Sequence, residues 1–598
     1  TITINSTETS NLNNLKLNIT DDRKTAINIM TGKVNINNAN ITQTNNEKQA
    51  QTIYVNTNST ANILYTDITL NAPEINSEDN TKLSAAIYSK GRVTTNHNNI
   101  NINTTKTEEN GKITAIIYPY KIISSTITIN AKNNAIGIIN TNNQNNPYIE
   151  YTIFNIYSNN QTMGILEEKE ILINTTAILF NTRSSNITLA SPITIGIKII
   201  NTNAYIENNI INTNGTKNIP IYIENSITST IIENKYLSNP NTQNIFKNMI
   251  HISLSKNNMT VEKQKNLPLI TIENAKTAYI SYNYLKTEDL QGNYAVKTIN
   301  VTNITMNLNE PGIKITNENY NKYFTNQTLN SNIDAIELGS NLYNKNMTFN
   351  HRVKIKNSNN YTIYNGTLTF TENATGSTIT GIKIHNTDDR QTSLEIYSKS
   401  TTITNNTIYQ ENTNNPAKTI IIDNTESVTF KYNNITTIGK NVTILILNNV
   451  KKTNSLQLNT VNGKGSNITA IEVLNSKTAT TIMIMTHNIT LESENPITAV
   501  RFINSKGARL LNSKIIVKTR NYNTPIIEVI NASTNAIQNN YIESEDVCGN
   551  NAVKKSGTGT ATISNNKPTN GNYRTQMNII LPSELKVSKT YPITINVT

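Results

Sequence analysis

The sequence predicts an all-β protein built from two tandem right-handed parallel β-helices, in which short strands coil into a stacked solenoid. Three observations predict this class: a strand-and-break pattern without helical periodicity, a repeat of roughly 25 to 29 residues, and two long internal matches. Asn makes up about a fifth of the 598 residues, and Trp is absent. Charged residues are 15%, against roughly 25% in an average globular chain. This composition favours a repeat stack over several globular domains.

The strand pattern begins at the first residues and continues along the chain. Short Ile, Val, Leu and Tyr segments alternate with Asn-Asn or Asn-Thr breaks, so helices should be nearly absent. The cycle is clearest where units begin at Ser427, Thr453, Thr478 and Ala508. Alternate side chains of such strands should point into a continuous aliphatic core. We expect one wall to contain residues 420–422, 444–447, 471–474, 500–503 and 526–530.

Asparagine suits the corners of such coils for two reasons. It tolerates the left-handed backbone conformation, and its amide can hydrogen-bond to an equivalent Asn in the coil above or below. The sequence therefore predicts stacked Asn residues where a glycine-rich protein would place Gly.

Two internal matches define the modules. Ten of eighteen positions are shared between Ile280–Lys297 and Ile537–Lys554, at an offset of 257. Thr9–Ala26 likewise resembles Gly376–Ser393, at an offset of 367. Because the starts differ by 367 and the ends by 257, the first module should carry 110 more residues, or roughly four extra coils. We expect a first module over 1–305, which begins after its own start, and a second over 306–566 with an N-terminal cap.

The second module carries the motifs of a known family. The runs NYNKYF, TLNSNIDAIELGSNLYNKNMTFNHRVKI and GSTITGIKIHNT resemble the cap and first coils of the methanogen adhesin-like proteins, and GNxAV at Gly292–Val296 and Gly549–Val553 resembles their closing coil. The resemblance covers nearly the whole chain. It implies an archaeal, Asn/Thr-rich, extracellular cell-surface protein with parallel β-helix repeats. It also implies that residues 567–598 begin an Ig-like domain that is cut off, and that the chain is a fragment whose anchoring region lies elsewhere in a longer protein.

Charge and cysteine content exclude several other classes. The net charge is +12, but Lys is spread along the chain rather than clustered, so we expect no nucleic-acid partner. Cys548 has no partner for a disulfide, and Gln291 replaces it in the earlier copy, which argues against a reactive thiol. There is no apolar run of membrane-spanning length, so no membrane span is expected in this part of the protein.

One polar cluster could carry catalysis. His385, Asp388, Asp389 and Arg390, with Asp423 one coil on, could bind a cation or supply an acid and a base beside a uronate. The structural alternative is a solvated turn in which short Asp side chains bond to the backbone. The first module keeps Asp21, Asp22 and Arg23 but has Asn in place of His385 and Asp423, which favours the turn.

No other motif in the sequence indicates a metal site or a phosphate-binding loop. The five His residues are far apart, and GKGSN at Gly463 lacks the spacing of a phosphate-binding loop. We therefore expect no catalytic residues, no metal and no cofactor. Absent Trp and scarce Phe argue against a dense aromatic sugar-stacking platform, although 27 tyrosines leave room for one.

The functional expectation is a non-enzymatic, adhesin-like rod that attaches to carbohydrate or other cell-surface ligands through many weak contacts. The alternative is a β-helical polysaccharide lyase or glycoside hydrolase with its site near Asp388. A third hypothesis is a disordered Asn-rich tract, but the regular Ile-bearing strands argue against it. If the chain is exported, exposed Asn-x-Ser/Thr sequons should carry glycans; examples are Asn5, Asn18, Asn40, Asn160, Asn186, Asn326, Asn365, Asn434, Asn467, Asn488 and Asn531.

Overall fold

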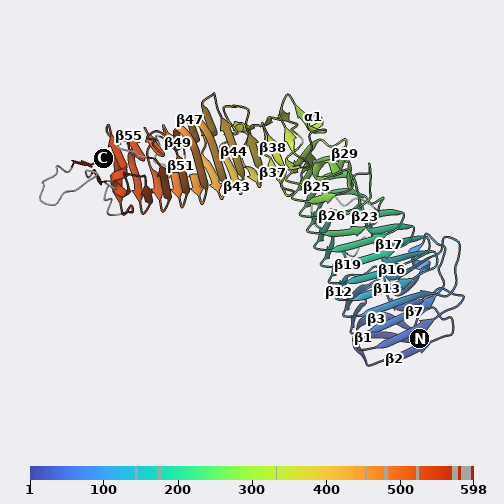
Figure 1. Ribbon diagram of the computed structural model, residues 1–598. Coiled ribbons are helices and arrows are strands. Elements are labelled where there is room, and N and C mark those ends of the chain that lie inside the picture. Colours follow the sequence, from blue (N-terminus) through green and yellow to red (C-terminus); the bar gives the residue numbers. More distant parts are fainter. Residues whose placement is uncertain are drawn as a thin grey trace. The chain divides into compact units, whose positions relative to one another are not determined.

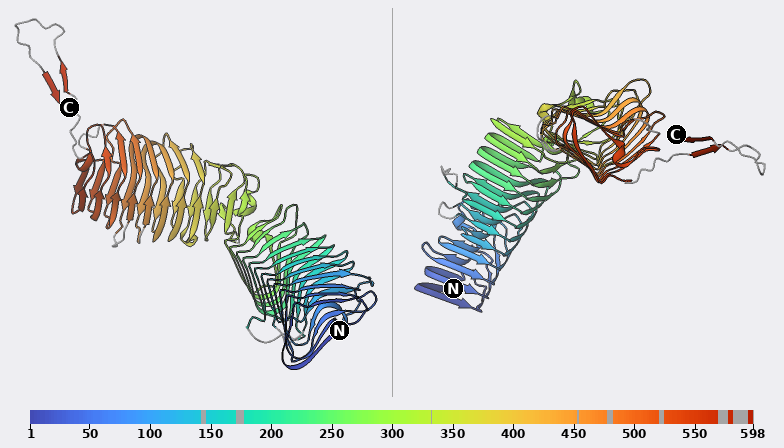
Figure 2. Two further views of the ribbon diagram at one scale, coloured as in Figure 1. Left: turned by 90° about the horizontal axis from the view of Figure 1, so that it is seen from below. Right: turned by 90° about the vertical axis from the view of Figure 1, so that its left-hand side faces the viewer.

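The computed structural model describes residues 1–141, 146–170, 177–331, 333–451, 454–476, 482–519 and 524–568, and the backbone of 577–580 and 594–597. The chain is an all-β solenoid of about 21 coils of parallel strands, which confirms the predicted class. It divides into two compact units, unit 1 (Thr1–Pro311) and unit 2 (Gly312–Thr598), close to the predicted boundary at residue 305. Figures 1 and 2 show the strands of each unit stacked side by side along its length.

Each coil of unit 1 contributes strands to three parallel ladders, which we call faces I, II and III in chain order. Five long strands bend from face I into face II: β1 (Ile2–Asn13), β3 (Ile27–Asn37), β23 (Lys217–Ile232), β25 (Asn244–Ser255) and β27 (Ile270–Ser281). The other strands of face I are β5 (Gln51–Val55), β8 (Ser84–Ser89), β11 (Lys112–Ile117), β14 (Asn134–Asn140), β17 (Gln161–Glu168), β20 (Ile193–Ile200) and β29 (Val296–Ile299).

The remaining strands of unit 1 complete the other two faces. Face II also contains β6 (Thr60–Leu64), β9 (Arg92–Asn96), β12 (Lys121–Ile123), β15 (Tyr148–Glu150), β18 (Phe180–Arg183), β21 (Ala204–Glu207) and β30 (Asn303–Asn307). Face III contains β2 (Lys16–Ile19), β4 (Asn40–Thr44), β7 (Asp67–Ala72), β10 (Asn99–Thr104), β13 (Thr126–Asn130), β16 (Ile153–Tyr157), β19 (Asn186–Ala190), β22 (Ile210–Asn214), β24 (Lys235–Ser238), β26 (Asn258–Thr260) and β28 (Tyr284–Lys286). The short 3-10 turns are η1 (Asn80–Lys82) and η2 (Gly292–Ala295).

Unit 2 has the same three faces, and two of its long strands, β47 (Asn434–Asn448) and β49 (Thr460–Leu474), run from face III into face I. Face II contains β31 (Ile313–Ile315), β34 (Ala335–Leu338), β37 (Lys354–Lys356), β40 (Ser377–Thr380), β43 (Ser400–Thr404), β46 (Ser427–Lys431), β48 (Asn454–Gln457), β50 (Ile482–Met485), β53 (Ala508–Leu511), β56 (Ser533–Gln538) and β59 (Thr560–Ser564). Face III contains β35 (Leu342–Tyr343), β38 (Thr362–Tyr364), β41 (Lys383–Asn386), β44 (Thr407–Asn412), β51 (Asn488–Glu492), β54 (Lys514–Lys518) and β57 (Tyr541–Glu543).

Face I of unit 2 begins at a small cap. The cap is the helix α1 (Tyr320–Tyr323) and the hairpin of β32 (Phe324–Thr325) with β33 (Thr328–Leu329). Face I continues through β36 (Met347–Phe349), β39 (Leu368–Phe370), β42 (Leu394–Ile396), β45 (Ala417–Asp423), β52 (Val500–Ile503), β55 (Ile527–Ile530) and β58 (Val553–Ser556). The 3-10 turns are η3 (Glu372–Ala374) and η4 (Gly549–Ala552). Among the residues the structure describes, no helix is long and apolar enough to cross a membrane.

The predicted core wall is confirmed by the strand register. Ile420, Leu445, Ile471, Val500 and Ile527 lie opposite one another in successive coils of face I. All five are fully buried. Burial of one such side chain stabilises the fold by about 1.5 to 3 kcal/mol, so the stack of coils supplies the core that a single coil cannot.

The duplicated segments occupy equivalent places in the two units. Strand β2 corresponds to β41 at the offset of 367, and β28 corresponds to β57 at the offset of 257. Face II strands give a count of the coils in the described structure. Unit 1 has eleven of them from β1 to β27, and unit 2 has seven from β40 to β56. This difference of four coils agrees with the difference between the two offsets.

The corners hold left-handed asparagines, as predicted. Among the described residues, 27 of the 44 non-glycine residues with positive φ are Asn. At the corner between faces I and II (corner 1), the amides form a surface ladder with Nδ2–Oδ1 distances of 3.0 to 3.1 Å. Its members are Asn201, Asn225, Asn248, Asn274 and Asn300.

A second Asn ladder is buried at the corner between faces II and III (corner 2). In unit 1 it runs through Asn209, Asn234, Asn257, Asn283 and Asn309, each at most 3% exposed. Each amide satisfies backbone groups of neighbouring coils as well as the next amide, because an unpaired buried polar group would be costly.

The closing turns end this ladder in both units. Asn293 of η2 accepts from Asn309 at 2.7 Å, and Asn550 of η4 accepts from Asn566 at 2.8 Å. The repeated Gly-Asn pair therefore supplies the acceptor for the last buried amide. This role explains why the Gly-Asn pair is present in both copies whereas Cys548 is not.

His487 interrupts the corner-2 ladder of unit 2 between Asn459 and Ser513. Its Nε2 contacts the Leu456 carbonyl at 3.0 Å, the place that an Asn amide takes elsewhere, but its buried Nδ1 has no partner in the described structure. Burial lowers the pKa of His487 from 6.5 to about 4. Below pH 6.5 this histidine is protonated in the unfolded chain, whereas in the folded chain it stays neutral down to about pH 4. The free energy of unfolding therefore decreases as the pH falls from 6.5 to about 4.

We expect His487→Asn to remove this acid sensitivity. Between pH 7 and pH 4.5 the parent chain should lose about 2 to 3 kcal/mol more stability around residues 482–511 than the variant, since one pKa unit corresponds to about 1.4 kcal/mol. Hydrogen exchange at several pH values, corrected for intrinsic rates, measures the difference. Equal losses in both proteins would contradict the assignment.

The C-terminal residues are described only in part. The backbone of β60 (Met577–Ile580) pairs antiparallel with β61 (Thr594–Val597). The rest of 569–598 lies outside the described residues, and the Ig-like domain stays a prediction.

Candidate functional site

The predicted cluster at Asp388 is a turn at the corner between faces III and I (corner 3). Arg390 donates from Nε to Oδ1 of Asp388 at 2.7 Å and from Nη2 to Oδ2 at 2.6 Å. Its Nη1 also donates to Asn346 and Thr367 of preceding coils, each at 3.0 Å. The hydrogen bond from Arg390 lowers the pKa of Asp388, so this carboxylate is ionised at neutral pH and is a poor proton donor.

Asp389 is a capping residue. It has a left-handed backbone (φ 55°), and its Oδ1 accepts the backbone N–H groups of Thr413 and Asn414, the latter at 3.2 Å. These hydrogen bonds, the one from Asn414 first, lower the pKa of Asp389. Its carboxylate is occupied in joining two successive coils.

Unit 1 reproduces the main bonds of this turn, although in the described residues Arg23 lacks the bonds that Arg390 makes to preceding coils. Arg23 pairs with Asp21, and left-handed Asp22 accepts the backbone N–H groups of Asn46 and Glu47. The amide of Asn45 donates to the Arg23 carbonyl at 2.9 Å, as that of Asn412 donates to Arg390 in unit 2. The turn is repeated, and all four of its Asp carboxylates accept hydrogen bonds from the protein. Both facts favour a structural role for the cluster over a catalytic one.

His385 and Asp423 lie apart from this turn. His385 is on the outer side of β41, in a column of rings with Tyr343, Tyr364 and Tyr409, and its centroid lies 4.5 Å from that of Tyr409. Rings stacked along the solenoid cover one another's faces, so the column presents edges rather than a sugar-stacking platform. Asp423 ends β45 at corner 1, where Asn448 of the next coil donates to it at 3.0 Å.

Metal and thiol chemistry find little support in the described residues. No group of three or more His, Cys, Asp or Glu side chains is placed to hold a metal ion in the part of the chain that the structure describes. Burial, and then the nearby Glu543 carboxylate, raise the pKa of the Cys548 thiol, which makes it a weaker nucleophile at neutral pH.

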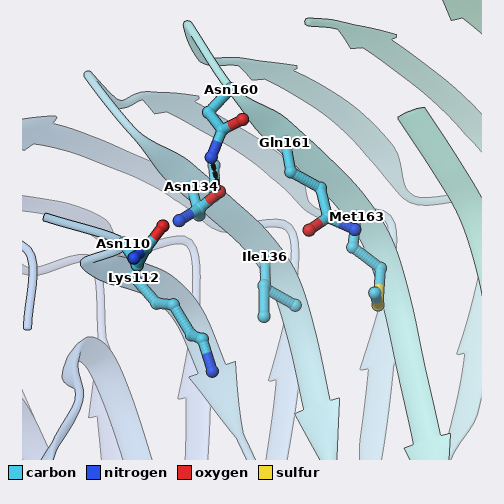
Figure 3. A pocket seen from close by; sticks show the side chains of 8 residues that line it. Asn110, Lys112, Asn134, Ile136, Asn160, Gln161 and Met163 are labelled. Carbon is cyan, nitrogen blue, oxygen red and sulfur yellow. Dashed lines mark hydrogen bonds between the residues drawn. The ribbon is translucent and has the colours of Figure 1, made fainter. Parts of the chain in front are cut away.

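In the part of the chain that the structure describes, two hollows are candidate binding sites. The smaller, of about 210 Å³, lies in unit 1 where β11, β14 and β17 begin. Figure 3 shows Asn160 hydrogen-bonded to Asn134 across it, at 3.0 Å, with Ile136 and Met163 beyond. This volume is below the roughly 300 Å³ of typical ligand pockets, and the amide of Asn134 is further engaged with the Gly111 carbonyl.

The larger hollow is a groove of about 700 Å³ at corner 3 of unit 2, which we call the corner-3 groove. Its floor is formed by β47 and β49, which pass the corner without a loop. Its walls are formed at the loops that follow β44 and β51. Its lining residues are Asn412, Thr413, Ile438, Gly439, Lys440, Lys464, Gly465, Ser466, Glu492, Ser493, Glu494 and Lys518.

Stacked glycines make the floor possible. Gly439 lies between Asn412 and Gly465 in the register, with φ values of 156° and 137° for the two glycines. A Cβ on Gly465 would lie 1.9 Å from the Gly439 carbonyl oxygen, and one on Gly439 would lie 2.4 Å from that of Asn412. Only glycine lets these two coils turn the corner in close contact, which leaves the floor below the neighbouring loops.

The groove offers hydrogen bonds and charge rather than apolar contact. Lys440, Lys464 and Lys518 are exposed, and Lys464 pairs with Glu492 at 3.2 Å. The other polar side chains of the lining are the hydroxyls of Thr413, Ser466 and Ser493, the amide of Asn412 and the carboxylates of Glu492 and Glu494, with Ile438 as the apolar member. An arrangement of this kind can hold a hydroxyl-rich chain and one or two anionic groups.

Sequence reasoning missed this site. The GKGSN segment at Gly463 failed as a phosphate-binding loop, yet it supplies Lys464, Gly465 and Ser466 to the floor. The signal in the sequence is that two successive coils run from strand to strand at this corner without a loop, whereas the neighbouring coils have longer loops there. Neither a protein-family model nor a curated protein matches the chain.

Proposed function

We propose that the protein is a non-enzymatic, cell-surface attachment protein that binds an extended carbohydrate chain in the corner-3 groove. The groove is the observation behind this proposal. At about 700 Å³ it has the size of a ligand site, and its floor is fixed by the backbone pairing of β47 with β49. The solenoid fold is compatible both with adhesin-like proteins and with proteins that act on polysaccharides.

The chemistry of the lining favours carbohydrate over peptide. Peptide grooves commonly offer apolar pockets or a free strand edge. Here Ile438 is the apolar side chain of the lining, and the β47 and β49 backbones are paired with coils on both sides. Sugar hydroxyls match the Ser and Thr partners. The three lysines outnumber the two carboxylates of the groove, Glu492 and Glu494, which favours chains that carry carboxylates or sulfates.

Attachment follows from repetition of weak contacts. A single polar groove gives modest affinity because each hydrogen bond replaces one to water. Many copies on a surface, each engaging a long polymer, raise the effective affinity by avidity.

The rival proposal, polysaccharide cleavage, has less support from the predicted residues. Asp388 and Asp389 have lowered pKa values and fixed partners, which suit a turn and not a general acid. Glu492 and Glu494 in the groove are the remaining carboxylates beside a bound chain. Any cleavage should therefore require them.

Charge reversal in the groove tests the proposed binding. The double variant Lys440→Glu with Lys518→Glu should weaken binding of acidic glycans on an array, and in solution titration, by about tenfold or more, or about 1.4 kcal/mol. The double variant Lys399→Glu with Lys555→Glu is the matched control, since these exposed lysines lie outside the groove and the change in net charge is the same. An equal loss in both variants would show that general charge, and not the groove, governs binding.

A further inference from the structure

Some sequons form a column along one edge of face III. Five Asn-Ile-Thr or Asn-Met-Thr triplets begin a face III strand or, in β47, the face III part of the strand. The register places them at the same position of their coils, in one column per unit. They are Asn40, Asn186 and Asn258 in unit 1 and Asn434 and Asn488 in unit 2. We call these five residues the column asparagines.

Strand geometry orients each triplet in the same way. Successive side chains of a strand alternate between its two sides. The middle residue is fully buried, as for Ile187 and Ile489, whereas the Asn is exposed and the Thr lies with it on the outer side. Thus the strand pattern of this fold presents both recognition side chains of the sequon to solvent.

The column asparagines differ in their hydrogen bonding from two other sequon residues, Asn300 and Asn467. In the described structure their side-chain amides make no hydrogen bond to the protein. By contrast, the amide of Asn300 donates to Asn274 at 3.0 Å in the surface ladder of corner 1, and that of Asn467 donates to Asn441 of the preceding coil at 2.6 Å. A glycan on such a ladder residue would occupy the nitrogen that joins two coils.

We propose that the exported protein carries N-linked glycans on the column asparagines. The donor class is a lipid-linked oligosaccharide diphosphate, and a membrane oligosaccharyltransferase supplies the catalysis. The amide Nδ2 forms a bond to the anomeric carbon of the first sugar, the bond from that carbon to the lipid diphosphate breaks, and Nδ2 loses one proton. No oxidant or reductant is consumed.

The spacing of the column leaves room for these glycans. Asn434 and Asn488 are two coils apart, Asn186 and Asn258 three, and Asn40 and Asn186 five. At about 4.8 Å per coil these separations are roughly 10, 14 and 24 Å. In β51 the glycan position Asn488 is the first residue, whereas the groove residue Glu492 is the last. Glycans would therefore shield one edge of face III and leave the groove open.

The test uses the full chain secreted from a eukaryotic host behind a cleavable leader. Peptide mass spectrometry, before and after enzymatic deglycosylation, gives the occupancy of each sequon. We expect most of the secreted chains to be modified at the column asparagines, and occupancy at least threefold lower at Asn300 and Asn467. The same peptides from chain retained in the cells show whether modification of a ladder residue blocks secretion instead.

The variant Asn488→Gln should lose the mass of one glycan and keep the far-UV spectrum of the parent. Column sequons without added mass in both fractions, or occupancy at Asn300 and Asn467 equal to that of the column in secreted protein, would overturn the proposal. This inference and the proposed function have one assumption in common, which is that the protein is exported. If groove binding is measured with the lysine variants on chain made without glycans, failure of one proposal is distinguishable from failure of the other.

Discussion

Asn433→Ala should lower the free energy of unfolding of the coils around it by about 3 to 5 kcal/mol. The Asn433 side chain accepts the backbone N–H and the amide of Asn406, at 3.0 and 2.9 Å, and donates to the Ile403 carbonyl and to Asn459, at 3.1 and 3.0 Å. It is 1% exposed, so water does not replace these bonds after truncation. Each buried polar group left unpaired costs about 1 to 3 kcal/mol.

The neighbouring residue supplies the control. Asn434→Ala alters an exposed side chain that makes no hydrogen bond to the protein in the described structure, and it should change stability by less than about 0.5 kcal/mol. Hydrogen exchange of peptides over 400–412 and 427–461 measures both variants. Similar exchange in Asn433→Ala and the parent would show that the buried ladder does not hold the coils together.

Gly465→Ala should destabilise the same region by about 3 kcal/mol or more and abolish binding in the groove. The added Cβ would lie 1.9 Å from the Gly439 carbonyl oxygen, a backbone atom that moves only if two coils separate. The φ of 137° adds strain for any residue with a side chain. Separation of the coils would also displace Lys440 and Lys464, which the floor holds in place.

Ser466→Ala is the matched change one residue on. It removes a hydroxyl from the groove without adding volume, so it should leave hydrogen exchange unchanged and weaken binding by no more than about fivefold. Hydrogen exchange over 434–448 and 460–474, with glycan titration of both variants, gives the comparison. A stable, fully binding Gly465→Ala variant would refute the close packing of the glycine corners.

The fold could be predicted from the sequence because its determinants are local. Alternation places Ile420, Ile471 and Ile527 on the inner side of their strands, and repetition stacks them. The same reasoning predicted left-handed asparagines at the corners. It did not separate the surface ladder through Asn225, which is itself left-handed at corner 1, from the buried ladder through Asn234, which follows left-handed Glu233 at corner 2.

The candidate site could not be predicted in the same way. The groove exists because two corners lack loops between coils that have them, and relative loop height is a property of neighbouring coils and not of one motif. Conversely, Asp388 and Asp389 stood out as acidic residues beside an Arg, yet their bonds to Arg390 and to the Thr413 backbone show that they shape a turn. Duplication at Asp21 and Asp22 was the sequence signal for that role.

We propose that the chain holds polysaccharide in the corner-3 groove without cutting it. The most direct measurement incubates the full chain with acidic and neutral polysaccharides. It records, in one experiment, the polymer retained by the protein and the length distribution of that polymer over time. We predict retention of an acidic polymer, lost in the Lys440→Glu, Lys518→Glu variant, with an unchanged length distribution. Shortening of the polymer by the parent chain, or retention that the groove variant leaves intact, would contradict this proposed function.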